Sequence, residues 1–219
     1  MNITKRLNQF ANFLRNRKKH SARNWILVYG LPRSGTSYIL NKLMAQSRCG
    51  AGDWELPSIG NLMSNFEQEA HIDLSMEDFL EDLKSNVFRN ATPGGGIKYD
   101  IVIKQVNLTS TGSQFLNKLF GCPPAHTIFC FREPNSWLPS AMKKFNIEEN
   151  EAVRLYMDNL QAYSEIGGVP IEYSSIGSNQ AIKFFQINTE DFIPTSMNAN
   201  EVPELTEAYN RFKASQSLD

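Results

Sequence analysis

From residue 25 onwards, short unbroken apolar runs alternate with longer stretches in which apolar residues recur at helical spacing. Runs of the first kind are typical of strands buried on both faces, and they predict strands over residues 25–29, 100–104, 126–131 and 181–187. Helical spacing predicts helices over residues 38–46, 58–69, 75–89, 114–120 and 148–166. This alternation favours a three-layer α/β fold, in which a mostly parallel central sheet of about four to five strands is covered by helices on both faces.

Length and composition indicate one large domain behind a basic arm. The chain has 219 residues, of which 41% are hydrophobic, which fills one substantial core and excludes collagen-like, disordered and disulfide-stapled chains. The net charge is −1, yet residues 1–24 hold seven basic side chains and no acidic one, which leaves 15 basic and 23 acidic groups in the remainder. We expect an arm over residues 1–24 and a single domain over residues 25–219. The chain lacks the overall positive charge of a dedicated nucleic-acid binder.

The arm carries an amphipathic pattern, because Ile3, Leu7, Phe10 and Leu14 recur at helical spacing among basic residues. Such a helix suits peripheral contact with an anionic membrane surface, docking on a partner, or packing against its own domain. The sequence alone does not choose between these roles.

Nothing in the chain reads as a membrane span or a secretory signal, since no apolar run approaches the roughly 18 residues that a span needs. Cys49, Cys122 and Cys130 are odd in number and include no CxxC pair, which favours reduced thiols. We therefore expect a cytoplasmic protein, with peripheral membrane contact through residues 1–24 as an open addition.

The segment Gly30-Leu-Pro-Arg-Ser-Gly-Thr-Ser37 lies between the first predicted strand and the helix that follows it. It fits the outline GxxxxGK[ST] of a phosphate-binding P-loop, with Thr36 in place of the lysine. Main-chain N–H groups of such a loop, together with the helix N-terminus, hold an anion, and this makes the expected fold P-loop-like. An ATPase or kinase uses the lysine with Mg²⁺ to offset charge between the β- and γ-phosphates, which Thr36 cannot do.

A second motif follows the strand at residues 126–131: Arg132 stands at its end, with Pro134 two residues on and Ser140 eight residues on. An arginine offers a planar two-pronged donor to a phosphate, and the serine adds a neutral donor from a helix that Pro139 can start but not continue through. Both motifs end predicted parallel strands, where such sheets place ligands.

Together these two motifs resemble sulfotransferases that use 3′-phosphoadenosine 5′-phosphosulfate (PAPS), and the PRSGT form of the loop is closer to the tyrosylprotein and carbohydrate branches than to the cytosolic branch. The resemblance implies a PAPS-dependent, metal-free, in-line transfer to a hydroxyl of a carbohydrate or another alcohol or phenol, with adenosine 3′,5′-bisphosphate (PAP) as product. It implies that the loop binds the phosphosulfate end of the donor and the second motif its 3′-phosphate. The implied donor-binding residues are Arg33, Ser34, Gly35, Thr36, Ser37, Arg132 and Ser140.

The resemblance also implies catalytic roles for Glu55, Arg33 and Lys104. Glu55, in a Cys-Gly…Glu…Pro stretch after the loop helix, is the expected general base, and Asp53 is the second choice. Arg33 and Lys104 are expected to support the bridging oxygen of the leaving group, although the family's proline after the lysine is missing here. No glycine follows Gly177, so the family's Gly-rich segment over the adenosine is also missing.

Two other interpretations stay open at this level. An atypical P-loop kinase acting on a nucleotide or a small molecule would show Mg²⁺-dependent ATP turnover. A non-catalytic module that binds anions or a membrane surface would instead depend on the basic arm. The scattered His20, His71 and His126 indicate neither a metal cluster nor a nucleophile pair.

Overall fold

The structure is a computed structural model of the chain and describes residues 23–52, 76–178, 180–195 and 201–216. The backbone divides into two compact units. The first unit consists of Met1–Leu27, Leu43–Lys104 and Thr111–His126, and the second of Val28–Lys42, Gln105–Ser110 and Thr127–Asp219. The single domain expected over residues 25–219 stays a prediction, and residues 1–22 of the arm lie outside the described residues.

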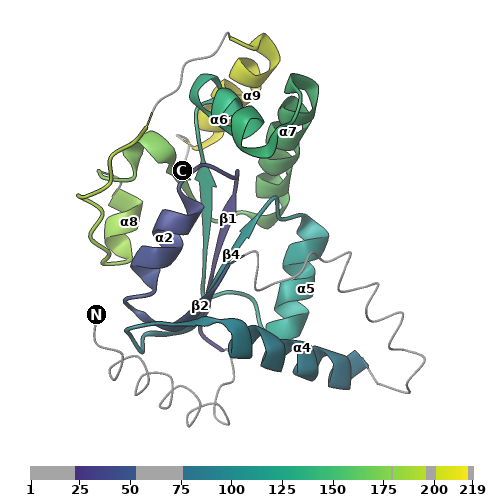
Figure 1. The fold of residues 1–219 in the computed structure, drawn as a ribbon, viewed down its shortest axis with the longest axis vertical. Helices are drawn as coiled ribbons and strands as arrows, with labels where there is room; N and C mark the ends of the chain where they lie inside the picture. The colour runs from purple at the N-terminus through teal and green to yellow at the C-terminus, as the bar shows by residue number, and fades with distance from the viewer. Residues whose placement is uncertain (1–22, 53–75, 179, 196–200, 217–219) are drawn as a thin grey trace. The chain divides into compact units, whose positions relative to one another are not determined.

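In the part of the chain that the structure describes, six strands form one sheet in the order β3-β2-β4-β1-β5-β6. They are β1 (Trp25–Gly30), β2 (Ser47–Ala51), β3 (Thr92–Pro93), β4 (Tyr99–Val106), β5 (His126–Phe131) and β6 (Val169–Glu172). β2 is parallel to β4 and β5 is parallel to β6, whereas the two-residue β3 is antiparallel to β2. Helices flank the strands (Figure 1), which confirms the α/β fold with a mostly parallel sheet, although with six strands rather than the expected number of about four to five.

Within the described residues the helices are α2 (Thr36–Leu43), α4 (Met76–Asn90), α5 (Ser110–Phe120), α6 (Pro134–Phe145), α7 (Glu149–Ile166), α8 (Gln180–Phe184) and α9 (Pro203–Gln216), with one 3-10 turn, η3 (Tyr173–Ser175). Four of the five predicted helices are confirmed within a few residues, and the fifth, over residues 58–69, lies outside the described residues. Boundaries differ from expectation mainly where a loop residue joins the first turn, as at Thr36.

An aromatic cluster anchors the core of the first unit. The ring centroid of Trp25 lies 4.8 Å from that of Phe120, and Phe88 of α4 meets Phe120 edge-on at 6.4 Å. The indole Nε1 of Trp25 donates to the carbonyl of Cys122 at 3.1 Å, so the buried ring keeps its polar group satisfied. These contacts explain why the apolar runs at residues 25–29 and 114–120 became buried elements.

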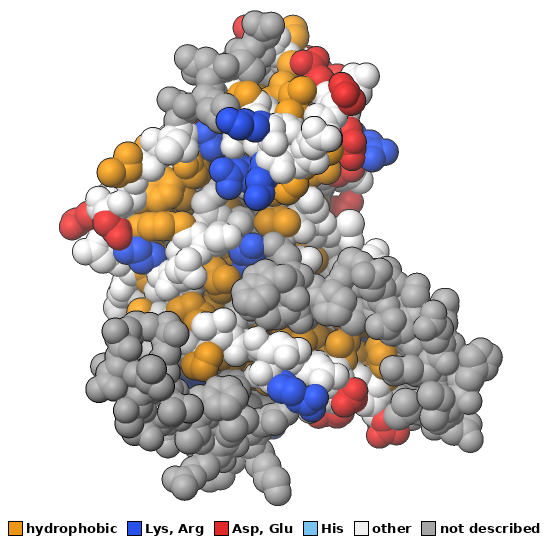
Figure 2. All heavy atoms as spheres, viewed as in Figure 1, with side chains coloured by type: hydrophobic (Ala, Val, Ile, Leu, Met, Phe, Trp, Pro, Cys, Tyr) orange, Lys and Arg blue, Asp and Glu red, His pale blue; other side chains and the backbone are white. Residues whose placement is uncertain are grey.

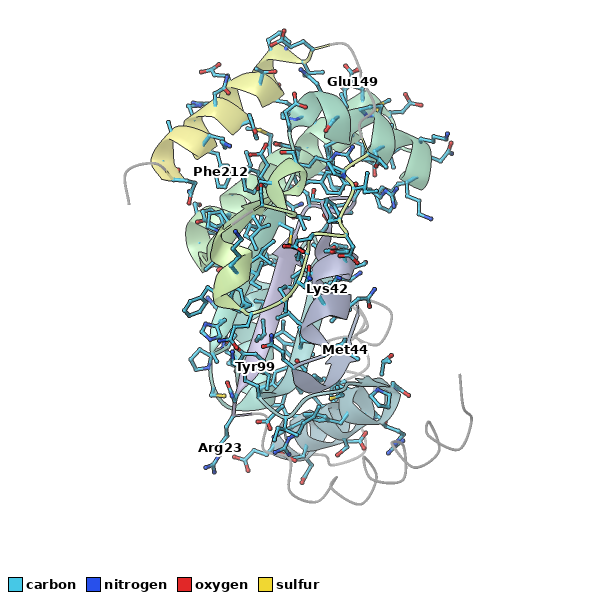
Figure 3. The ribbon with its side chains drawn as sticks, turned by 90° about the vertical axis from the view of Figure 1, so that its left-hand side faces the viewer. Arg23, Lys42, Met44, Tyr99, Glu149 and Phe212 are labelled. Carbon is cyan, nitrogen blue, oxygen red and sulfur yellow. The ribbon has the colours of Figure 1, made fainter. Side chains whose placement is uncertain are left out.

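A second aromatic cluster organises the second unit around Phe212 of α9, which is labelled in Figure 3. Its ring lies 5.9 Å from Phe129 and 4.8 Å from Phe131 of β5, and 5.1 Å from Tyr163 of α7. α9 is not among the predicted helices. Its buried Leu205, Ala208 and Phe212 nevertheless stand at helical spacing, the signal that could have revealed it.

The strand predicted over residues 181–187 is wrong, because this segment contains α8 and then a turn. Ile182 and Phe185, three positions apart, are buried, whereas Phe184 between them is 67% exposed. That pattern fits one helical face and not a strand buried on both sides. The edge of the sheet beside β5 is taken by β6, a strand that contains Pro170 and that was not predicted.

Two further expectations need correction. The helix carrying Ser140 begins at Pro134 and continues through Pro139, which occupies an interior position and removes one helical hydrogen bond. β4 continues to Val106, so Lys104 lies within that strand rather than at its end.

Residues 92–96 run closely along the backbone of residues 44–48. The N–H of Gly94 donates to the carbonyl of Arg48 at 2.7 Å, and that of Gly96 to the carbonyl of Ser47 at 3.1 Å. A Cβ added at Gly94 would lie 2.0 Å from the Ser47 carbonyl oxygen, whereas one at Gly95 would meet nothing closer than 3.7 Å. Glycine at position 94 therefore serves close backbone packing.

Gly94→Ala is expected to lower the free energy of unfolding by about 2–4 kcal/mol, because the clash is with backbone that cannot move aside. Gly95→Ala is the matched control. It should be neutral or stabilise by up to about 1 kcal/mol through the unfolded chain. Urea denaturation of both variants measures this difference, and equal midpoints would contradict the close packing seen at Gly94.

Among the helices of the described ranges, none combines the length and the apolar character needed to cross a membrane.

Candidate functional site

The loop after β1 starts with a turn that only glycine accommodates. Gly30 has φ +127°, and a Cβ there would lie 2.2 Å from the carbonyl oxygen of Cys130 in β5. The next residue, Leu31, donates its N–H to that same carbonyl at 3.0 Å. The loop therefore leaves the carboxyl end of β1 pressed against β5, at the edge where parallel sheets bind ligands.

The interior of the loop presents a buried hydroxyl group. Ser34 is fully buried, and its Oγ has no hydrogen-bond partner among the described residues. Thr36 is 3% exposed and begins α2, whose first turn closes when Ile39 N–H donates to the Gly35 carbonyl at 3.0 Å. A buried, unsatisfied hydroxyl at a helix N-terminus is costly unless a ligand pairs with it.

Arg33 has a strained backbone, with φ +66° for a residue with a side chain. Its side chain is exposed, and its Nε donates to Oγ of Ser140 on α6 at 3.3 Å. One turn earlier on α6, Trp137 Nε1 donates to the Pro32 carbonyl at 2.7 Å. α6 thus holds the loop at two consecutive residues and joins Arg33 to Ser140, two residues that the sequence analysis had assigned to one ligand.

Arg132 follows β5 directly and is almost completely buried. Its Nε donates to Oγ of Ser136 at 2.9 Å, its Nη1 to the Arg33 carbonyl at 3.3 Å, and its Nη2 to the Thr195 carbonyl. All three acceptors are neutral, and Arg132 forms no ion pair with a carboxylate in the described ranges. Burial, with Arg33 close by, lowers the pKa of the guanidinium from its usual value. A buried cation with neutral partners is the arrangement that an anionic ligand would stabilise most.

The register of β5 and β6 brings Tyr173 to Arg132. Phe131 pairs with Glu172 in parallel register, so the residues after them, Arg132 and Tyr173, emerge side by side. The guanidinium carbon lies 4.2 Å from the centroid of the Tyr173 ring, in a cation–π contact. Burial by itself would raise the pKa of the Tyr173 phenol. The hydrogen bonds with Thr195 and the positive charges of Arg132 and Arg33 outweigh burial, so the pKa lies below its usual value.

The positive charge of the second unit extends along α6, where Lys143 and Lys144 stand exposed in the last turn, three and four residues after Ser140. That spacing places them on the helix face that carries Ser140. Figure 2 shows Lys and Arg side chains gathered in the upper half of the view, where Figure 1 draws α6 and the end of β1. Lys143 and Lys144 thus add two positive charges near Ser140, which attract an anionic ligand.

The remaining predicted residues are Ser37, Lys104, Asp53 and Glu55. Ser37 is an exposed residue of the first turn of α2. Lys104 belongs to the first unit and is buried in β4. Asp53 and Glu55 lie outside the described residues. Within the described ranges, no group of three or more His, Cys, Asp or Glu side chains is placed to hold a metal ion.

Sequence reasoning missed three residues that surround Arg132. Ser136 could have been found, since it stands four residues after Arg132 and near the start of a helix. Tyr173 and Thr195 could not, because Tyr173 reaches Arg132 only through strand pairing and Thr195 lies 63 residues along the chain from it.

No family model and no curated protein matches the sequence. Solved structures that match this chain include the following two. The sulfotransferase domain from the Synechococcus PCC 7002 olefin synthase is 13% identical with a TM-score of 0.49, over 92% of this chain and 97% of that chain. The shikimate kinase from Bacteroides thetaiotaomicron is 14% identical with a TM-score of 0.34, over 89% of this chain and 97% of that chain. Because both identities are low and both TM-scores are below 0.5, the two similarities carry no conclusion about the reaction.

Proposed function

We propose that this protein is a sulfotransferase that moves the sulfuryl group of PAPS to a hydroxyl group of a carbohydrate or another alcohol or phenol. The observation that carries the proposal is that the two sequence motifs meet within the second unit. Arg33 of the loop donates to Ser140, and Arg132 donates to the main chain of the same loop. A donor with phosphate groups at both ends of its ribose calls for two such anion-binding segments side by side.

The donors present fit such a ligand. The unpaired Oγ of Ser34 and the main chain at residues 34–37 would receive the phosphosulfate end, together with Arg33. Arg132 and Ser140 would receive the 3′-phosphate, since Arg132 is a buried cation whose hydrogen-bond acceptors in the described ranges are all neutral. When bound, PAPS supplies an activated sulfuryl group and a phosphate leaving group.

The residue at position 36 favours sulfuryl over phosphoryl transfer. Thr36 is buried where a P-loop kinase places the lysine that offsets charge on the transferred phosphoryl group. A sulfuryl group carries less charge, so side-chain donors such as Arg33 suffice at the bridging oxygen. In the reaction the acceptor O–H loses its proton to a base, a bond forms between sulfur and the acceptor oxygen, and the bond from sulfur to the bridging oxygen breaks.

A transfer assay with labelled PAPS would identify the general base, once a screen of hydroxylated compounds has found an acceptor. Glu55→Gln is expected to lower the transfer rate by about 100-fold or more, the usual contribution of a general base, with PAP affinity unchanged. Asp53→Asn is the matched control and should retain activity. Loss of activity in Asp53→Asn alone would move the base to Asp53. Mg²⁺-dependent ATP turnover with no sulfuryl transfer would contradict the proposed function.

A further inference from the structure

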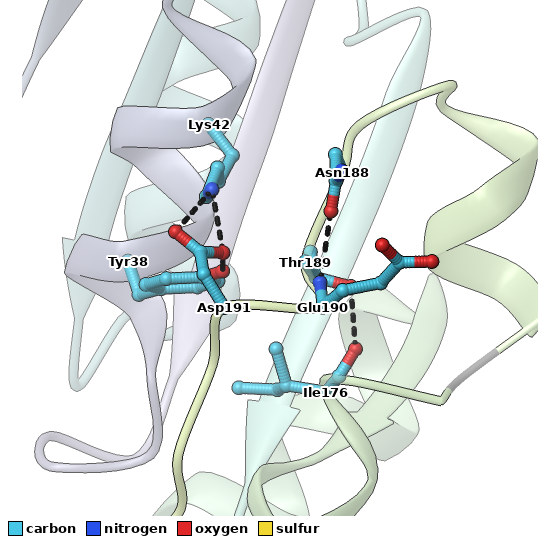
Figure 4. A network of polar contacts seen from close by, with 7 residues as sticks. All are labelled: Tyr38, Lys42, Ile176, Asn188, Thr189, Glu190 and Asp191. Atoms are coloured by element: carbon cyan, nitrogen blue, oxygen red, sulfur yellow. Dashed lines mark hydrogen bonds and ion pairs between the residues drawn. The ribbon is translucent and has the colours of Figure 1, made fainter.

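Residues 188–195, called the strap below, cross the second unit without forming a helix or a strand. Within the strap, Phe192 N–H donates to the Thr189 carbonyl at 2.9 Å, and Thr189 Oγ1 attaches the strap to the segment after η3 by donating to the Ile176 carbonyl at 2.9 Å. Figure 4 shows this segment beside α2. Asp191 and Thr195 of the strap make contacts of different kinds.

One attachment of the strap is an exposed ion pair with α2. Lys42 Nζ lies 2.7 and 2.8 Å from the two carboxylate oxygens of Asp191, and the hydroxyl of Tyr38 donates to the same carboxylate (Figure 4). Tyr38 and Lys42 are one turn apart on α2, so both reach a single acceptor. The Phe192 ring adds a contact, with its centroid 4.7 Å from that of Tyr38.

The other attachment lies on the candidate anion site. The carbonyl of Thr195 accepts a hydrogen bond from Nη2 of Arg132. The hydroxyl of Tyr173, whose ring lies under the same guanidinium, is 3.1 Å from Oγ1 of Thr195 and accepts from its N–H at 3.3 Å. The strap thus places the negative end of a peptide dipole against the buried cation.

A bound phosphate and the Thr195 carbonyl would compete at Nη2 of Arg132, because each edge of the guanidinium that offers two neighbouring N–H groups includes this nitrogen. Hydrogen bonds engage each of the three nitrogens of Arg132. A two-pronged bond to phosphate needs two neighbouring N–H groups, and two acceptor oxygens at one donor repel each other. Ser136 lies within α6, and Arg33 lies in the loop that hydrogen bonds attach to Trp137 and Ser140 of α6. The Thr195 carbonyl, on a segment without regular secondary structure, is the partner that can leave.

We propose that the strap is an autoinhibitory latch: while Asp191 is fastened to α2, the Thr195 carbonyl competes with the phosphate group of the ligand for Arg132. The proposal rests on the proposed function, since it assumes that Arg132 receives a phosphate of the nucleotide. The observed dissociation constant then equals the intrinsic one divided by the fraction of molecules with an open strap. Weakening the attachment at Asp191 raises that fraction and tightens binding.

The test compares PAP binding by calorimetry in the full-length wild type, Asp191→Asn, Lys42→Gln and the control Glu190→Gln. Asp191→Asn and Lys42→Gln both break the latch, but they change the net charge in opposite directions. We expect both to lower the dissociation constant by about two- to fivefold, the range that loss of an exposed ion pair allows. Glu190→Gln removes an acid from the same segment, and the side chain of Glu190 points away from Lys42 in Figure 4. It should change the dissociation constant less than Asp191→Asn does.

If Asp191→Asn and Lys42→Gln changed the dissociation constant of PAP in opposite directions, the effect would be simple charge attraction, and the latch proposal would be overturned. Weaker binding in both variants would also overturn it, because the strap would then close over the ligand. Hydrogen exchange gives an independent reading: PAP should speed exchange at the Thr195 amide of the wild type, and slower exchange would overturn the latch. Binding by none of the four proteins would overturn the proposed function and the latch together, whereas binding insensitive to both latch variants overturns the latch alone.

Discussion

Replacing Arg132 with alanine is expected to weaken PAP binding by about one to two orders of magnitude, which is the contribution of a charge-assisted, two-pronged hydrogen bond. The reason lies in its surroundings. Its guanidinium is buried, lies over the ring of Tyr173 and, among the described residues, hydrogen-bonds only to neutral acceptors, so a phosphate would supply the anionic partner that they do not. Calorimetric titration with PAP measures the effect directly.

The matched control is Arg154→Ala, since Arg154 is an exposed arginine of α7 in the same unit. It removes the same charge and should leave the dissociation constant nearly unchanged. Arg132→Lys keeps the charge without the planar fork and should fall between the two. Thermal unfolding of each variant separates a loss of binding from a loss of folded protein. Full affinity in a folded Arg132→Ala protein would remove Arg132 from the site.

Gly30→Ala is expected to lower the free energy of unfolding by about 3 kcal/mol or more, through a strained backbone together with an overpacked contact. At φ +127° a side chain is disfavoured, and the added Cβ would lie 2.2 Å from the Cys130 carbonyl oxygen. Because the loop leaves the sheet at this residue, PAP binding should weaken as well. Urea denaturation with an unchanged m-value would assign the effect to stability.

Gly121→Ala is the control for Gly30→Ala. Gly121 also has a positive φ, +73°, but a Cβ there would meet nothing within 4 Å. Its replacement should destabilise by only about 1–2 kcal/mol, the penalty of the left-handed conformation alone. Equal losses in the two variants would show that the contact with Cys130 does not constrain position 30.

The local signals of the sequence were sufficient for elements that are buried on all sides. Residues 25–29 and 126–131 are unbroken apolar runs, and both became strands. Residues 181–187 show where this reasoning fails, since their apolar positions suit a strand as well as one turn of helix. The tertiary structure selects the helix for two reasons. The place beside β5 in the sheet is occupied by β6, and a helix puts the buried Ile182 and Phe185 on the same face.

β2 had no comparable signal. Its sequence, Ser-Arg-Cys-Gly-Ala, lacks large apolar residues, and its strand conformation comes from parallel pairing with β4, in which Ser47 pairs with Tyr99 and Ala51 with Ile103. Pairing over such sequence distances depends on the positions of other elements. A local window of the sequence does not contain that information.

The sequence by itself determined the chemistry available at the site: a glycine-bounded loop after a strand, Thr36 in place of a lysine, and Arg132 eight residues before Ser140. These are local features, set by residue type and short spacing. Only the tertiary structure decided what surrounds Arg132. Strand register brings Tyr173 beneath it, and a segment 63 residues along the chain places the Thr195 carbonyl against its guanidinium. Such contacts arise from long-range packing, which is why the latch is visible in the fold and not in the motif.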